Sequence, residues 1–171
     1  SSKVNDPLSI TKDEFLAFYE KMKTLPDGLP QDEISQNYHN ARKIPEKLAA
    51  VGFMIVPLGT EEEMGVLTDA EFEKVSRLEH IRWVRHHIEN GWCYASVKNK
   101  AMKLHDALIP WDEEEQKNVN EVYGASYAQR MGNSEGNVLS QYYRILDRVI
   151  TMAIPWILEC VGYQMVRVEK V

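Results

Sequence analysis

One pattern occurs twice in this chain, because residues 44–56 correspond to residues 154–166 at an offset of 110 residues (154 minus 44). Both copies read Ile-Pro-x-x-Leu-x-x-Val-Gly and continue with an aromatic residue and a short apolar run. The apolar spacing is typical of a helix, the glycine is a natural helix C-cap, and the run that follows predicts a β-strand. A repeated helix, cap and strand indicates two copies of one supersecondary unit, each with an apolar face to bury. We therefore expect a mainly α fold with short β-strands, in which two related helical repeat units pack about a pseudo-twofold axis.

Local signals predict where the elements begin and end. Thr11 with Glu14, and Thr68 with Glu71, have the spacing of capping boxes at helix N-termini. The expected segments are a helix from residue 11, a turn at 25–30, a helix over 32–51 with a kink or break at Pro45, a strand at 53–56, a helix over 68–90, an ordered surface loop over 92–110, a polar helix over 112–122, a mobile segment or surface lid over 124–137, a helix from 138 that Gly162 caps, and a strand at 163–168. The two strands are candidates for pairing across the pseudo-twofold axis.

Charge and composition exclude several classes of protein. The chain has 171 residues and a formal net charge of −6, which argues against a general nucleic-acid binder because such proteins carry a basic footprint. No stretch approaches the roughly 18 uninterrupted apolar residues of a membrane span. The two cysteines, Cys93 and Cys160, suggest no disulfide framework and are expected as reduced thiols. The sequence thus predicts a cytoplasmic protein.

A series of short motifs follows residue 78. They are Glu79-His80-x-x-Trp83, Gly91-Trp92-x-Tyr94, His105-x-x-Leu108-Ile109-Pro110-Trp111, Asp147-Arg148 and Ile154-Pro155-x-x-Leu158-x-x-x-Gly162-Tyr163. In this order they resemble the ryanodine-receptor repeat domain, and most of all its bacterial versions, in which a partial unit precedes a complete one. The resemblance covers about residues 30–57 and 69–168. It implies a partial N-terminal repeat unit at 1–57, a linker at 58–68 and a complete unit at 69–171 with an insertion near 120–140.

The chain departs from the family pattern in a few places. Ala95 stands where the family usually has Gly, and Asp106 stands where it usually has Pro. The first unit lacks a Gly-Trp motif. We therefore expect one complete unit only.

The resemblance implies a module without catalytic activity. Bacterial relatives resemble sensor domains for nucleotide-like ligands, whereas the animal repeats are appended lobes of a calcium-release channel. We therefore expect the chain to bind a nucleotide-like or other anionic small molecule. The alternative is a pure docking module, whose partner is another protein domain or a second copy of the chain. No cofactor is implied, and the sequence contains no nucleophile elbow, phosphate-binding glycine loop or zinc-enzyme motif.

The residues after Gly91 have the chemistry of a ligand site. Trp92 and Tyr94 offer flat rings for stacking, and Lys98 and Lys103 offer positive charge for a phosphate or carboxylate. Arg148, in the last predicted helix, is a candidate for a bidentate clamp on an anion. The alternative is that Trp92 fills the core and the lysines are solvated.

Two further candidates, His80 and Trp83, lie one turn apart on the helix over 68–90. His80 could contact the ligand, or it could be a structural histidine that bonds a carboxylate. The neighbouring pair His86-His87 does not predict a metal site, because adjacent residues on a helix point about 100° apart. We expect neither a metal nor a catalytic residue.

Overall fold

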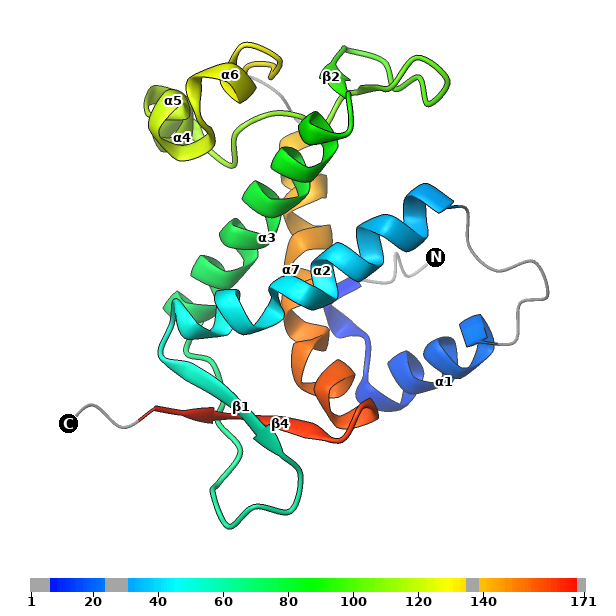
Figure 1. Ribbon diagram of the computed structural model, residues 1–171, viewed down its shortest axis with the longest axis vertical. Coiled ribbons are helices and arrows are strands. Elements are labelled where there is room, and N and C mark those ends of the chain that lie inside the picture. Colours follow the sequence, from blue (N-terminus) through cyan, green and yellow to red (C-terminus); the bar gives the residue numbers. More distant parts are fainter. Residues whose placement is uncertain (1–6, 24–30, 135–138, 169–171) are drawn as a thin grey trace, which may run out of the picture. The chain divides into compact units, whose positions relative to one another are not determined.

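The computed structural model describes residues 7–23, 31–134 and 139–168, and these fold mainly into helices with a few short strands (Figure 1). The predicted fold class is confirmed at this level. In chain order the elements are the 3-10 helix η1 (Pro7–Ser9), α1 (Lys12–Lys23), α2 (Gln31–Ala49), β1 (Phe53–Pro57), α3 (Asp69–Glu89), β2 (Cys93–Tyr94), β3 (Leu104–His105), α4 (Glu113–Lys117), α5 (Val119–Tyr123), α6 (Ala125–Ala128), α7 (Leu139–Cys160) and β4 (Tyr163–Arg167). The expected turn at 25–30 lies outside the described residues.

The predicted capping box at Thr68 is complete, and at Thr11 the bond from the helix N–H to the threonine hydroxyl is present. The backbone N–H of Glu71 donates to the Thr68 hydroxyl at 3.2 Å, and the Glu71 carboxylate accepts from the N–H of Thr68 at 2.9 Å. At α1 the N–H of Glu14 donates to the Thr11 hydroxyl at 3.2 Å. Each cap satisfies backbone donors that the first helical turn leaves without partners, which typically stabilises a helix by about 1 kcal/mol. The sequence therefore placed both helix starts correctly.

Helix α2 continues through Pro45, so the expected break is absent. A proline inside a helix removes one N–H, here the donor to the carbonyl of Ala41. Pro45 lies on the exposed face, where water can solvate that carbonyl, while Ile44 and Leu48 beside it are buried. Burial of the apolar face therefore keeps the helix continuous. Helix α7 likewise contains Pro155 without ending there.

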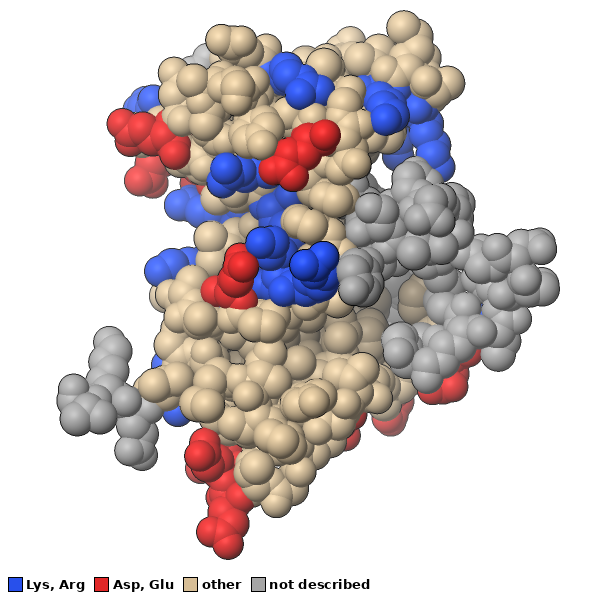
Figure 2. Space-filling model, viewed as in Figure 1, with Lys and Arg blue, Asp and Glu red and all other residues tan. Residues whose placement is uncertain are grey.

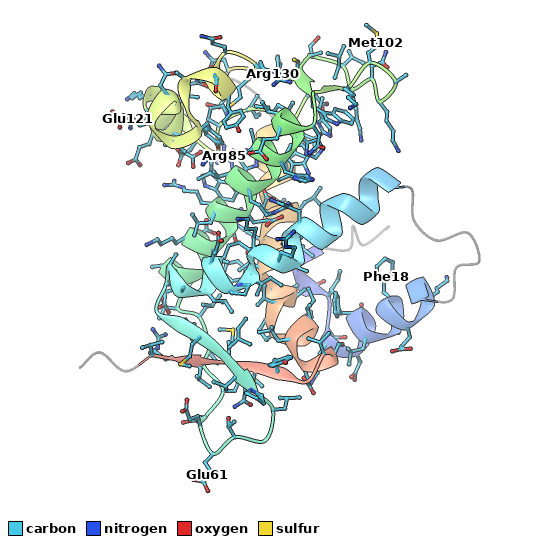
Figure 3. The ribbon with its side chains drawn as sticks, in the orientation of Figure 1. Phe18, Glu61, Arg85, Met102, Glu121 and Arg130 are labelled. Carbon is cyan, nitrogen blue, oxygen red and sulfur yellow. The ribbon has the colours of Figure 1, made fainter. Side chains whose placement is uncertain are left out.

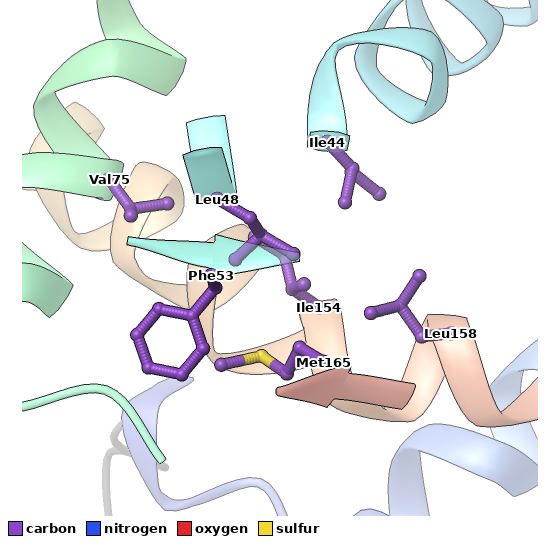
Figure 4. Close-up of a cluster of buried hydrophobic side chains, with 7 residues drawn as sticks. All are labelled: Ile44, Leu48, Phe53, Val75, Ile154, Leu158 and Met165. Atoms are coloured by element: carbon purple, nitrogen blue, oxygen red, sulfur yellow. The ribbon is translucent and has the colours of Figure 1, made fainter. Parts of the chain in front are cut away.

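The chain forms two compact units. The first, unit 1, falls within Ser1–Ser76 and Arg148–Val171. Its sheet has two strands, since β1 pairs antiparallel with β4 in a register that sets Ile55 opposite Met165. The predicted pairing of the two strands is thus confirmed. The core beneath this sheet consists of Ile44, Leu48, Phe53, Val75, Ile154, Leu158 and Met165 (Figure 4).

Unit 2 comprises Arg77–Asp147. It contains most of α3, the parallel strand pair β2–β3, the short helices α4 to α6 and the start of α7. Its buried core is formed by Val84, Ile88, Trp92, Leu108 and Tyr123. The Tyr123 hydroxyl donates to the buried Glu115 carboxylate at 2.5 Å, and that carboxylate also accepts from the N–H of Trp111. Glu115 therefore ties α4 to α5 and to the segment that precedes them.

Three predictions for unit 2 were wrong. The second half of the loop over 92–110 is not on the surface, because Ala107, Leu108, Ile109 and Pro110 are all buried. The polar helix over 112–122 is two helices, since the N–H of Asn118 bonds back to Glu114 and Glu115 and ends α4.

The third error concerns residues 124–134, which were predicted to have little to bury and instead pack on the core of unit 2. Tyr127 and Met131 pack against the unit 2 core, and the N–H of Gly132 donates to Leu108 at 2.8 Å. Gly132 lies flat against Tyr94, so that an added Cβ would come within 2.6 Å of the Tyr94 ring. The glycine here serves a close approach, whereas the sequence reading took it as a sign of mobility. Residues 135–138 lie outside the described residues.

None of the helices in the described ranges combines the length and apolar composition that a membrane crossing requires.

Candidate functional site

Four aromatic rings of unit 2 form a cluster, which we call the ring cluster: Trp83, His87, Trp92 and His105. Helix α3 supplies Trp83 and His87 one turn apart, with ring centroids 3.9 Å from each other. His105, at the end of β3, meets the Trp83 ring edge-on with centroids at 4.9 Å. Trp92 contacts His87 at 5.2 Å and His105 at 5.9 Å. His87, His105 and Trp92 are buried, whereas Trp83 is half-buried.

Both histidines of the cluster are held neutral. Burial lowers the pKa of His87 to about 4, although its bond to the carbonyl of Trp83 opposes this shift. Burial also lowers the pKa of His105 to about 4, and the positive charge of Lys98 acts in the same direction. An imidazolium in either position would lose its hydration without gaining a carboxylate partner strong enough to compensate.

Hydrogen bonds identify the neutral tautomer of each ring. Nδ1 of His87 lies 3.0 Å from the carbonyl oxygen of Trp83, so it carries the proton and donates. Nδ1 of His105 lies 3.3 Å from the Asp106 carboxylate but 3.0 Å from the N–H of Ala107. The shorter contact is to a donor, so Nδ1 accepts from Ala107 and the neutral ring carries its proton on Nε2. No acceptor within the described residues bonds to His105 Nε2. The ring cluster therefore contains an N–H donor that is available to a ligand.

A tyrosine and a carboxylate border His105. The Tyr143 ring lies edge-on to His105, with centroids 6.0 Å apart. Its hydroxyl donates to the Asp106 carboxylate at 2.7 Å. Asp106 thus holds the Tyr143 hydroxyl beside the ring cluster.

His80 differs from the cluster histidines, because both of its nitrogens are engaged. Nε2 lies 2.6 Å from the carbonyl oxygen of Ile109, and Nδ1 lies 3.2 Å from the carboxylate of Asp147. Burial opposes a charge on His80, but the hydrogen bond and the charge of Asp147 outweigh it and raise the His80 pKa. Two acceptors on one ring favour the imidazolium. In this arrangement His80 joins α3, α7 and the segment before Trp111 and has no nitrogen left for a ligand.

The two predicted stacking residues have different surroundings. Trp92 is buried in the unit 2 core as well as in the ring cluster. Tyr94 is half-buried, with its ring against Gly132 and its N–H bonded to the carbonyl of Arg130 at 2.9 Å. Trp83, in contrast, keeps part of its ring accessible. Of the predicted aromatic residues, Trp83 is therefore the one best placed to contact a ligand beside His105.

The two predicted lysines also have different surroundings. Lys98 is exposed and lies close enough to His105 to lower its pKa. Lys103 donates from Nζ to the carbonyl of Asn90 at 2.8 Å, just beyond the end of α3. A cation in that place satisfies a terminal carbonyl and suits the helix dipole. Of the two predicted lysines, Lys98 is thus the one whose charge acts on the ring cluster, while Lys103 acts as a helix cap.

Arg148 belongs to unit 1 rather than to unit 2. Its Nε and Nη2 donate to the two carboxylate oxygens of Glu73, at 2.7 and 3.1 Å. The expected clamp geometry exists, but it holds a side chain of the protein itself. An anionic ligand would have to displace Glu73 to use this guanidinium.

Unit 1 carries an open groove with a volume of about 1190 Å³. The apolar side chains of Met54, Met64 and Val166 line it, together with Arg167, which donates to both oxygens of Glu71 at 2.8 Å. None of the predicted site residues lines this groove.

Sequence reasoning missed His87 and His105 as site residues. His105 was noted only as the first residue of the motif His105-x-x-Leu108-Ile109-Pro110-Trp111, and His87 was considered only as part of an adjacent pair for metal binding. Within the described ranges, no three metal-binding side chains come together. Comparison of the chain with known protein families and with curated proteins finds no match.

Proposed function

We propose that this chain is a ligand-sensing module of the ryanodine-receptor repeat family, that it is not an enzyme, and that it binds a nucleotide-like or other anionic small molecule at the ring cluster. A planar group of the ligand lies against Trp83, an acceptor atom takes the His105 Nε2–H, and the negative charge lies near Lys98. The observation that carries this proposal is the His105 Nε2–H, which has no acceptor within the described residues. An N–H donor on a buried ring among other aromatic rings, with a cation nearby, is the chemistry that nucleotide-like ligands use.

The absence of a catalytic role is supported by how the titratable groups are engaged. General acid–base catalysis needs a group whose pKa lies near the working pH and which reaches the substrate. His87 and His105 have a pKa near 4 and are neutral at pH 7, while both nitrogens of His80 are occupied. These histidines are therefore suited to binding and packing.

The location and partners form part of the same proposal. Cys93 and Cys160 are both free thiols, which is consistent with a reducing compartment such as the cytoplasm. The docking alternative, with a partner domain or a second copy as the partner, remains the competing function.

We also infer that the two helix–strand segments of unit 1 arose by duplication and are related by a local twofold axis. The β1–β4 register supports this inference, because Ile55 faces Met165, its own counterpart at the offset of 110 residues. The bonds that flank this pair also correspond: the N–H of Leu58 donates to Gly162, and the N–H of Val168 donates to Gly52. Such a reciprocal pair is what an axis through the centre of the sheet requires.

The helices agree with the same symmetry. Ile44 and Leu48 of α2 are buried, as are their counterparts Ile154 and Leu158 of α7. The two capping glycines have nearly equal positive φ angles, 81° and 87°. A superposition of residues 44–56 on 154–166 in an experimental structure tests this inference, and unrelated backbones would refute it.

A thermal-shift panel of nucleotides and dinucleotides tests the ligand proposal. A ligand that binds the folded state raises Tm in proportion to the logarithm of its concentration over Kd. We expect Lys98→Gln to weaken binding about tenfold, since a charged hydrogen bond contributes about 1.5–3 kcal/mol. His105→Phe, which retains a ring but removes the N–H donor, is expected to abolish the shift.

The matched control is Lys117→Gln, which removes one exposed lysine of α4 in the same unit and should bind as the wild type does. A wild-type protein that responds to no nucleotide, but changes mass when a partner is added or its concentration is raised, would favour the docking alternative. Equal affinities for the Lys98 and Lys117 variants would remove Lys98 from the site.

A further inference from the structure

The loop between β2 and β3 combines exposed apolar and basic side chains. Val97 is 74% exposed and Met102 is 69% exposed, although both are large apolar residues. Lys98, Lys100 and Lys103 lie between or beside them, and no acidic residue occurs from Gly91 to His105. This segment has a charge of +3 in a chain of net charge −6. The proposed ligand site at the ring cluster involves Lys98 alone among these lysines, and it gives no reason for the exposure of Val97 and Met102.

The loop is ordered although it is exposed. The N–H of Asn99 donates to Leu104 and the N–H of Leu104 donates back to Asn99, both at 2.9 Å. The Asn99 side chain also accepts from the N–H of Met102 at 3.1 Å, which closes the turn at the tip. Met102 points away from the ribbon in Figure 3, and basic side chains gather over this loop at the upper right of Figure 2. The fold therefore holds an apolar side chain in solvent on a backbone that is already ordered, which lowers the entropy cost of binding.

The chemistry of the tip identifies the surface that it fits. A protein interface of ordinary size takes about 20–30 residues from each side, which a single short loop does not supply. A membrane surface needs much less, because apolar side chains enter the interface while lysines meet lipid phosphates. An anionic membrane surface offers apolar surroundings to Val97 and Met102 and negative charge to the lysines, whereas water solvates only the lysines well.

We propose that the loop over residues 96–103 is a membrane-contact tip, which inserts Val97 and Met102 between anionic lipid headgroups and sets Lys98 and Lys100 against the phosphates. Neither the apolar insertion nor the attraction of the lysines is sufficient by itself, because stable attachment of a peripheral protein takes two signals. The contact is reversible and sensitive to salt. It lies beyond the ligand-sensing role and does not depend on it.

Co-sedimentation of the full chain with vesicles tests the proposal. The vesicles are phosphatidylcholine alone, or phosphatidylcholine with about 30 mol% phosphatidylserine as the anionic lipid. We expect binding only to the anionic vesicles, and loss of that binding in about 1 M salt, where the Debye length falls to about 3 Å. Each neutralised lysine, Lys98→Gln or Lys100→Gln, should weaken binding about fivefold.

The apolar component is tested by the double variant Val97→Ser/Met102→Ser, which should weaken binding more than tenfold. Its matched control is Met64→Ser/Val66→Ser, which changes the same two residue types at exposed positions of unit 1. Lys43→Gln/Lys117→Gln is the corresponding control for charge. Because all these side chains are exposed or half-exposed, the Tm of every variant should stay near that of the wild type.

Any of three results would overturn the proposal: no binding of the wild type to anionic vesicles, equal binding to neutral ones, or equal losses in the tip and control variants. In the first case an acidic protein surface becomes the better partner for the loop. Val97 and Met102 touch no proposed ligand atom, so vesicle binding and the nucleotide thermal shift fail or succeed separately.

Discussion

Acidification from pH 7 to pH 5 should destabilise this protein through its ring cluster. The pKa of His87 and of His105 is about 4 in the folded chain, against an ordinary value of 6.5. As the pH falls below 6.5 the unfolded chain takes up protons at these positions and the folded chain does not. Stability is therefore lost as the pH falls from about 6.5 to about 4.

The shifts set the size of the effect. At pH 5 each histidine lies about 1.5 pH units below its unfolded pKa, which corresponds to a loss of about 2 kcal/mol. The two together remove about 4 kcal/mol, a large part of the 5–15 kcal/mol that is typical for a folded domain. The His80–Asp147 pair does not add to this loss, because the folded state raises the pKa of both groups and so favours their protons. Glu71, with a pKa lowered to about 2, matters only below about pH 4.5.

Urea unfolding at the two pH values measures the effect. With a slope near 2 kcal/mol per molar, a loss of about 4 kcal/mol lowers the midpoint by about 2 M. The variant His87→Phe keeps an aromatic ring against Trp83 but cannot titrate, so about half of the pH dependence should disappear. Equal midpoints at pH 7 and pH 5, or an unchanged pH dependence in His87→Phe, would refute the reasoning. NMR titration of the imidazole resonances gives the two pKa values directly.

Three further predictions concern packing and hydrogen bonds, and each is measured as the free energy of unfolding. Gly132→Ala should cost about 1–3 kcal/mol, because its Cβ would come within 2.6 Å of the Tyr94 ring, whereas Gly59→Ala meets no atom within 4 Å and reports only the cost of a positive φ. Tyr123→Phe should cost about 1–3 kcal/mol, since it leaves the buried Glu115 carboxylate with one donor fewer; an effect below about 0.5 kcal/mol would mean that water replaces the hydroxyl. Leu48→Ala and Leu158→Ala should each cost about 2–5 kcal/mol and differ little, since both side chains are buried at corresponding positions of one core, and a large difference would speak against their equivalence.

The elements that the sequence predicted best are those with local causes. The capping boxes at Thr11 and Thr68, the glycines at 52 and 162, and the strands that follow them all depend on residues within a few positions of each other. The repeat added the long-range pairing of β1 with β4, because two copies of one unit share a strand position.

The ring cluster could not be predicted in this way. His87 and His105 are brought together by the path of the chain through Trp92 and the β2–β3 pair, which no local period marks. Gly132 was misread for a similar reason, because its purpose is the close approach to Tyr94, far away in sequence. Lys98 and Lys103 look alike in the sequence. They differ in the structure because the Nζ of Lys103 donates to the carbonyl of Asn90 just beyond the end of α3.

The division of the chain into unit 1 and unit 2 explains why the repeat was visible in the sequence, whereas the ring cluster was visible only in the structure. Both copies of the repeated pattern, 44–56 and 154–166, fall in unit 1, where they build a core of corresponding side chains. The ring cluster and the exposed loop fall in unit 2, within Arg77–Asp147, which lies between the copies in sequence and shares none of the pattern. A duplicated segment can supply a stable framework, because each copy buries the other's apolar face. The proposed binding residues fall in the part of the sequence that does not repeat, so the repeat predicted the framework, and these residues had to be found from their contacts.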